Sequence, residues 1–160
     1  MKRDAKFEDG YDEPLNLGAI SDDDVQVISS LVQDSVFGFD DMKWHAKERR
    51  FVMLLNRFRW EIGDDARRGT ERVRSILIIK NVVKVASMGI DRNEAGIIFS
   101  LMTIEHENGN DGQNVLLTLS GDGAIRLQVS DLEVMLRDVT RPYRAPSGKV
   151  PDHGLRNGDK

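Results

Sequence analysis

The chain has 160 residues, of which 39% are hydrophobic and 31% are charged, and it contains no cysteine. This length suits one domain with its own core, and the lack of cysteine excludes disulfides, thiolate metal sites and thiol nucleophiles. The longest apolar run, residues 51–55, is far shorter than the roughly 18 residues of a membrane span. The N-terminus also lacks the apolar segment of a signal peptide. We therefore expect a cytoplasmic protein without a membrane partner.

Charge is distributed unevenly along the chain, although the net charge is only −4. Residues 1–41 carry three bases against eleven acids, residues 42–84 carry twelve bases against five acids, and residues 85–160 carry eight bases against eleven acids. A basic middle segment either steers an anionic partner or pairs with the acidic part of the same chain. We favour internal pairing.

Both ends of the chain differ in composition from its middle. Residues 1–13 hold five acids and three bases with little to bury, which predicts a flexible leader. Residues 141–160 contain three of the four prolines and three glycines, which predicts a disordered tail. A single domain over residues 14–140 remains.

The first predicted element is a helix at Ser21–Val32. Ser21 precedes three aspartates and can cap the first free amides, and Asp24 at the third helical position completes a capping box. Three carboxylates in the first turn also suit the positive end of a helix. The apolar residues that follow in the predicted helix are Val25, Val27, Ile28, Leu31 and Val32.

Alternating apolar and polar residues predict a series of short strands after this helix. Hairpin-type loops at 47–49, 108–112 and 121–123 separate several of them, and Lys80-Asn81 forms a tight turn or a bulge. The expected strands are 42–46, 50–60, 72–79, 82–87, 96–105, 115–120 and 124–129.

A second helix is predicted near the C-terminus. Ser130-Asp131-Leu132-Glu133 matches a capping box, and Pro142 would end the helix. The apolar residues that follow have helical spacing, at Leu132, Met135, Leu136 and Val139. Strands followed by a closing helix predict an α+β fold: an antiparallel β meander that curls into a barrel or sandwich. With an N-terminal helix and a C-terminal capping helix, its element order is similar to the pleckstrin-homology-like superfold.

Catalytic and metal-binding motifs are missing from the sequence. No glycine-rich phosphate loop precedes a helix, and no serine lies in a nucleophile elbow. His106 in Glu105-His106-Glu107 would point away from both neighbours on a strand, so the three do not form a metal site. We therefore expect no catalytic residue, no metal and no cofactor, and the protein is not predicted to be an enzyme.

Arginines near the middle of the chain form the candidate site. Along extended strands Arg57 and Arg59 share one face, and Arg72 and Arg74 share a face of the next strand. If these strands pair through the loop 61–71, the four arginines gather at one end of the sheet, below the loop. Such a cluster binds phosphate or a partner's carboxylates. The candidate contact residues are Arg57, Arg59, Arg67, Arg68, Arg72, Arg74 and Trp60.

Two interpretations of this cluster remain open. In the first, the arginines bind nucleic acid or another phosphate ligand while Trp60 and Phe58 stack a base. In the second, both aromatic residues are core and the arginines pair with acids of the same region, namely Glu61, Asp64, Asp65 and Glu71. We favour the second, because aromatic residues on strands are usually buried and the chain is acidic overall.

Taken with these motifs, the chain resembles a small, chiefly alphaproteobacterial domain-of-unknown-function family, DUF2948. The resemblance spans roughly residues 15–140. It rests on the acid-capped helix Ser21–Val32, on the stretch from Lys47 to Phe58, and on Gly123-Ala124-Ile125-Arg126-Leu127. It implies a cytoplasmic bacterial setting and supplies no catalytic residue.

The functional hypothesis is therefore a non-enzymatic protein-interaction or regulatory module whose partner is a protein of unknown identity. The alternative is a nucleic-acid or phosphate-ligand binder that uses the arginine cluster. A small hydrolase is the least favoured class, since no catalytic constellation is visible.

Overall fold

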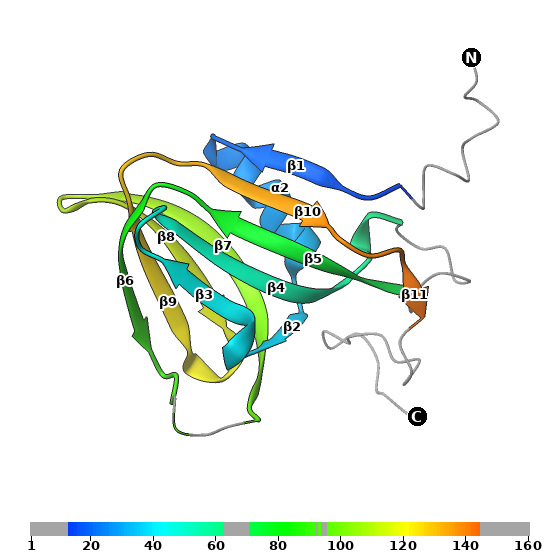
Figure 1. Ribbon diagram of the computed structural model, residues 1–160. Coiled ribbons are helices and arrows are strands. Elements are labelled where there is room, and N and C mark those ends of the chain that lie inside the picture. Colours follow the sequence, from blue (N-terminus) through cyan, green and yellow to red (C-terminus); the bar gives the residue numbers. More distant parts are fainter. Residues whose placement is uncertain (1–12, 63–70, 92, 94–95, 145–160) are drawn as a thin grey trace, which may run out of the picture.

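A computed structural model describes residues 13–62, 71–91, 93 and 96–144 (Figure 1). Apart from residue 13 and residues 141–144, the predicted leader and tail lie outside the described residues. The N-terminal helix is confirmed as α2, Asp22–Val32, and the Asp24 N–H donates to Ser21 Oγ over 3.3 Å. Val25, Ile28 and Val32 form the buried side of this helix.

All seven predicted strands are present, with small shifts at their ends. They are β3 Met42–His45, β4 Arg50–Phe58, β5 Glu71–Ile79, β6 Val82–Met88, β7 Ile98–Gly109, β8 Gly112–Leu119 and β9 Ala124–Val129. Four further strands were not predicted: β1 Asn16–Ala19, β2 Ser35–Gly38, β10 Val134–Asp138 and β11 Tyr143–Arg144. Short 3-10 turns at Phe39–Asp41, Trp60–Ile62 and Ser120–Asp122 link some of them.

The strands form one sheet in the order β1-β10-β5-β4-β2-β7-β8-β9-β6, while β3 pairs with β4 and β11 pairs with β5. Every described pairing is antiparallel. The order departs from the expected meander, because β6 pairs with neither β5 nor β7, its neighbours in the sequence. Lys80-Asn81 is therefore no hairpin. It carries the chain from β5 in one half of the sheet to β6 in the other. The segment before β10 runs beside it, and the Lys80 N–H donates to the Glu133 carbonyl there.

The predicted C-terminal helix is wrong, because residues 134–138 form strand β10 between β1 and β5. Val134, Leu136 and Asp138 are buried while Arg137 is exposed, which is the alternation of a strand. Pairing with β1 and β5 satisfies the backbone hydrogen bonds of β10 on both sides. These hydrogen bonds outweigh the helix-capping preference of residues 130–133. With no helix there, the element order loses the closing feature on which the pleckstrin-homology-like comparison rested.

Part of the sheet curls into an open ring, which runs from β3 through β4, β2, β7, β8 and β9 to β6. The ring is not closed into the expected barrel, since β3 and β6 do not pair in the described topology. We call the gap between these two strands the seam. At one end it is held by the Val82 N–H, which donates to the Arg49 carbonyl over 2.9 Å.

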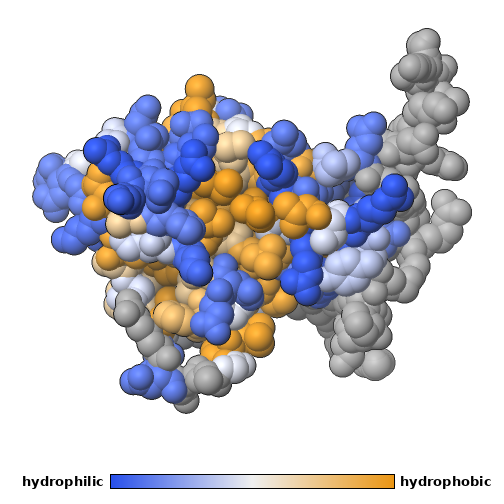
Figure 2. Space-filling view, in the orientation of Figure 1, coloured by the Kyte–Doolittle hydropathy of each residue, from blue (hydrophilic) through white to orange (hydrophobic). Residues whose placement is uncertain are grey.

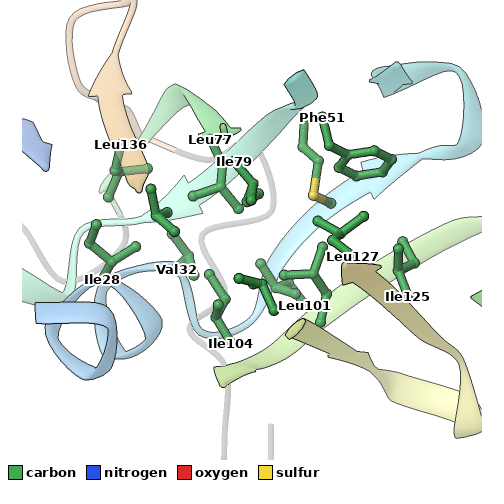
Figure 3. Packing of buried hydrophobic residues seen from close by; sticks show 14 of the residues in the cluster. Ile28, Val32, Phe51, Leu77, Ile79, Leu101, Ile104, Ile125, Leu127 and Leu136 are labelled. Atoms are coloured by element: carbon green, nitrogen blue, oxygen red, sulfur yellow. The ribbon is translucent and has the colours of Figure 1, made fainter. Parts of the chain in front are cut away.

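The hydrophobic core fills the inside of the curled sheet and is covered by α2. Ile28 and Val32 of the helix point towards Leu77 of β5 and Leu136 of β10, and Leu101, Leu127 and Ile125 continue the core into the other half (Figure 3). Each of these side chains is at most 2% exposed. Among the described residues, no helix is both long and apolar enough to cross a membrane.

Candidate functional site

Strands β4 and β5 pair as the arginine hypothesis requires, but the arginines divide between the two faces of the sheet. Phe58 lies opposite Arg72 and Asn56 lies opposite Arg74. Arg57 points into the core with 0% exposure, Arg72 is partly exposed and Arg74 is exposed. The pairing therefore brings Arg72 and Arg74 together on the outer face and separates them from Arg57.

The Arg57 guanidinium lies at the centre of a buried polar network. Nη1 and Nη2 donate to the two carboxylate oxygens of Glu61 over 2.7 and 3.0 Å. Nη2 also lies 3.1 Å from both oxygens of Asp138, and Nε donates to Ser75 Oγ over 3.1 Å. Charge-assisted hydrogen bonds of this bidentate kind are roughly twice as strong as hydrogen bonds between neutral groups.

Asp138 completes the network from strand β10. It accepts from the Ser75 hydroxyl over 2.6 Å and from the backbone N–H of Leu15 over 2.9 Å. The network thus joins β4, β5 and β10 to the residue that precedes β1. Asp138 and Ser75 were missed as network members in the sequence. For Asp138 the usable signal was its alternation with Val134 and Leu136, which the helix prediction hid.

Burial acts against both charges of the Arg57–Glu61 pair, because it raises the pKa of a carboxyl group and lowers that of a guanidinium. The hydrogen bonds and charges of the partners outweigh burial. The pKa of Glu61 is therefore lowered, chiefly by Arg57, and the pKa of Arg57 is raised by Glu61 and Asp138. Both groups are consequently charged at neutral pH.

Arg59 is also engaged within the fold. It is 4% exposed, its Nη1 donates to Glu71 Oε1 over 2.6 Å, and its Nε lies 3.6 Å from Glu61 Oε2. Of the predicted cluster, Arg57 on β4 and Arg59 just after that strand are thus paired with the acids Glu61 and Glu71.

The other candidate residues have different surroundings. The Arg72 guanidinium lies over the Phe58 ring, 5.5 Å from its centroid, in a cation–π arrangement. Phe58 packs against Trp60 with ring centroids 4.7 Å apart, and Trp60 Nε1 donates to the Gln33 carbonyl. Phe58 is 4% exposed, so its ring is not available to stack a base. Arg67 and Arg68 lie outside the described residues.

His106 forms a second polar site, between the β7–β8 hairpin and α2. Its Nε2 lies 2.9 Å from Gln113 Oε1 on β8, and its Nδ1 contacts Asp22 at the start of α2. This arrangement ties the helix to the β7–β8 hairpin. In the described part of the chain, no group of three or more His, Cys, Asp or Glu side chains could hold a metal ion.

An apolar area lies on the sheet face opposite α2, and we call it the outer patch. Its members are partly exposed and adjacent across β4, β5 and β10: Val52, Leu54, Ile76, Ile78 and Met135. Figure 2 shows hydrophobic side chains gathered over the centre of this face, with hydrophilic residues around them. Lys43, Arg74 and Arg137 are exposed at the rim of the patch. None of the described strand residues on this face of β3, β4, β5 and β10 is acidic.

These features define a class. In the part of the chain that the structure describes, an open, curled antiparallel sheet carries one α-helix, and a buried arginine–carboxylate network joins three of its strands. The chain belongs to the family described as "Protein of unknown function (DUF2948)", whose model matches residues 15–153. Neither a curated protein nor a solved structure gives a match.

Proposed function

We propose that this domain is a cytoplasmic, non-enzymatic module that binds another protein through the outer patch. The observation that carries the proposal is the apolar surface of β4, β5 and β10, which α2 leaves uncovered (Figure 2). Contiguous apolar surface surrounded by polar residues is typical of protein-contact sites.

Charge at the rim specifies the kind of partner. Lys43, Arg74 and Arg137 lie at the rim of the apolar residues. The acid just before β10, Glu133, is paired with Lys80. Electrostatic complementarity favours a partner whose contact surface has an apolar centre and an acidic rim. A basic partner would meet like charge and be disfavoured.

The internal ion pairs of Arg57 and Arg59 weaken the alternative, a binder of nucleic acid or another phosphate ligand. Both guanidinium groups already donate to carboxylates and are nearly inaccessible. That alternative now relies on Arg72 and Arg74, with Arg67 and Arg68 outside the described residues. A phosphate binder needs several accessible cations in one place.

The test is co-purification of the tagged, full-length protein from its native host, with wild type compared with Ile76→Lys and Val27→Lys. Ile76 belongs to the outer patch, whereas Val27 is 53% exposed on α2 and serves as the control. We expect a stoichiometric protein partner with wild type and Val27→Lys, and its loss with Ile76→Lys. Salt-sensitive retention of wild type on heparin, without a protein partner, would instead favour the phosphate alternative.

A further inference from the structure

We propose that the partner inserts an extended segment into the seam between β3 and β6, as an additional strand antiparallel to β6. This inference rests on the proposed protein-binding function and specifies the part of the partner that is bound. Strand addition to a free sheet edge is a common way to recognise extended peptides.

The backbone of the seam is suited to this role. In the described topology β6 has one neighbour, β9, and β3 has one neighbour, β4. Both strands therefore present an edge towards the seam, where backbone N–H and C=O groups can pair with an added chain. Among the described backbone hydrogen bonds, the start of β6 is joined to the turn after β3, where the Val82 N–H donates to the Arg49 carbonyl. The added strand would therefore lie beside the later residues of β6, from Lys84 to Met88.

A groove of about 220 Å³ occupies the seam. Met42 and Trp44 form one wall, and Val85 forms part of the other. Phe51 and Ile125, which are 4% and 2% exposed, lie beneath them. This lining is mostly apolar, and it would accept the inward-facing side chains of an inserted strand. Every second residue of the partner segment is therefore expected to be apolar.

Each of the two strands that border the groove carries one exposed cation. The only charged residues of β3 and β6 are Lys43 and Lys84, one on each side of the seam, and both are exposed. The outward-facing side chains of an inserted strand would lie between them. Charge complementarity thus favours Asp or Glu at those positions. The expected ligand is an extended segment that alternates apolar and acidic residues.

The seam is also continuous with the outer patch. Lys43 pairs with Val52, a member of that patch, across β3 and β4. A partner that inserts a strand at β6 could therefore place its adjoining surface over Ile78, which pairs with Val52. One partner would then bury both apolar areas, and its acidic residues would meet the cations at both rims.

The experiment measures binding of two fluorescein-labelled heptapeptides to the full chain by fluorescence anisotropy at low ionic strength. One peptide alternates valine with glutamate and the other alternates valine with lysine. We expect the Kd of wild type for the glutamate peptide to be about tenfold lower than its Kd for the lysine peptide. The reason is that Lys43 and Lys84 attract the glutamates of the first peptide and repel the lysines of the second. The double variant Lys43→Glu/Lys84→Glu should reverse this preference.

Two single variants test the groove itself. Val85→Glu places a carboxylate in the apolar wall and should weaken binding of both peptides. Val139→Glu introduces the same charge at a 44% exposed position beyond β10 and should leave binding unchanged. The charge-reversal variant keeps the test valid if Val85→Glu does not fold, because Lys43 and Lys84 are exposed.

Four results would overturn the proposal. In the first, neither peptide binds. In the second, wild type and the double variant each bind both peptides equally. In the third, the chain forms a dimer that Val85→Glu dissociates, and in the fourth the peptides bind only after residues 1–12 are removed. The third would assign the seam to a second copy and the fourth to the chain's own leader. If the peptides fail while Ile76→Lys still abolishes co-purification of a host protein, the proposed function stands and the seam inference alone is wrong.

Discussion

Replacement of Arg57 by methionine tests whether the buried network holds the sheet together. The change keeps most of the side-chain volume but leaves Asp138, whose side chain is 4% exposed, without its cation. Removing one partner of a buried ion pair typically costs about 3–5 kcal/mol. Asp138 retains donors from Ser75 and Leu15, so we expect a loss near the lower end, about 3 kcal/mol. For a domain of this size that lowers Tm by roughly 10 °C.

A double-mutant cycle separates the charge from the packing. Arg57→Met/Asp138→Leu removes both charges, and it should recover most of the loss because hydrophobic replacement of a buried ion pair is often neutral. Arg74→Met is the matched control, since it makes the same substitution at an exposed position on the paired strand. It should change the unfolding free energy by less than about 0.5 kcal/mol.

The assay is urea unfolding followed by circular dichroism, with thermal unfolding as a second measure. A loss below about 1 kcal/mol for Arg57→Met would refute the reasoning. So would a double variant whose loss equals the sum of the two single losses, because that result means the two side chains are not coupled.

Three further predictions concern stability. Leu136→Asp should lower the unfolding free energy by several kcal/mol, because Leu136 is 0% exposed in β10. Arg137→Asp, on the exposed side of the same strand, should lower it little. A wild-type Tm for Leu136→Asp would contradict the packing of this strand. Ser35→Ala should leave the unfolding free energy unchanged or raise it by up to about 1 kcal/mol, because the buried Ser35 Oγ lacks a hydrogen-bond partner in the described structure. If urea unfolding instead shows a loss of about 1 kcal/mol, the hydroxyl is hydrogen-bonded. The lowered pKa of Glu61 stabilises the fold above the ordinary glutamate pKa, and this contribution is lost as pH falls through the lowered value. Glu61→Gln should therefore flatten the acid side of the stability–pH curve, and equal acid slopes for the two proteins would contradict the assignment.

Local patterns predicted the elements whose signals lie within a few residues. Ser21 and the aspartates after it define the start of α2, and residues 108–112 define the turn between β7 and β8. The segment 130–139 shows the limit of such patterns, because it satisfies a helical spacing and a strand alternation at once. Only its distant partners, β1 and β5, decide between them. Four-residue strands such as β1 and β2 carry too few alternating positions to be recognised alone.

The candidate site was predictable only where its contacts are short in sequence. Acids near Arg57 and Arg59 in the sequence were foreseen as partners, and Glu61 and Glu71 take that role. Asp138 was not foreseen, since it lies 81 positions from Arg57. A contact over that distance depends on the strand order, which composition and periodicity do not encode.

The position of β10 also constrains when the protein can fold. The only sheet neighbour of β1 in the described topology is β10, and the hydrogen bond from Leu15 to Asp138 spans 123 positions. At synthesis rates of about 5–20 residues per second, the first strand emerges from the ribosome roughly ten seconds before its partner exists. Until then β1 has no sheet partner, and the edge of β5 that β10 occupies stays unpaired. The nascent chain is therefore expected to depend on chaperones, and its final docking step should be slow, as is usual for folds dominated by distant contacts.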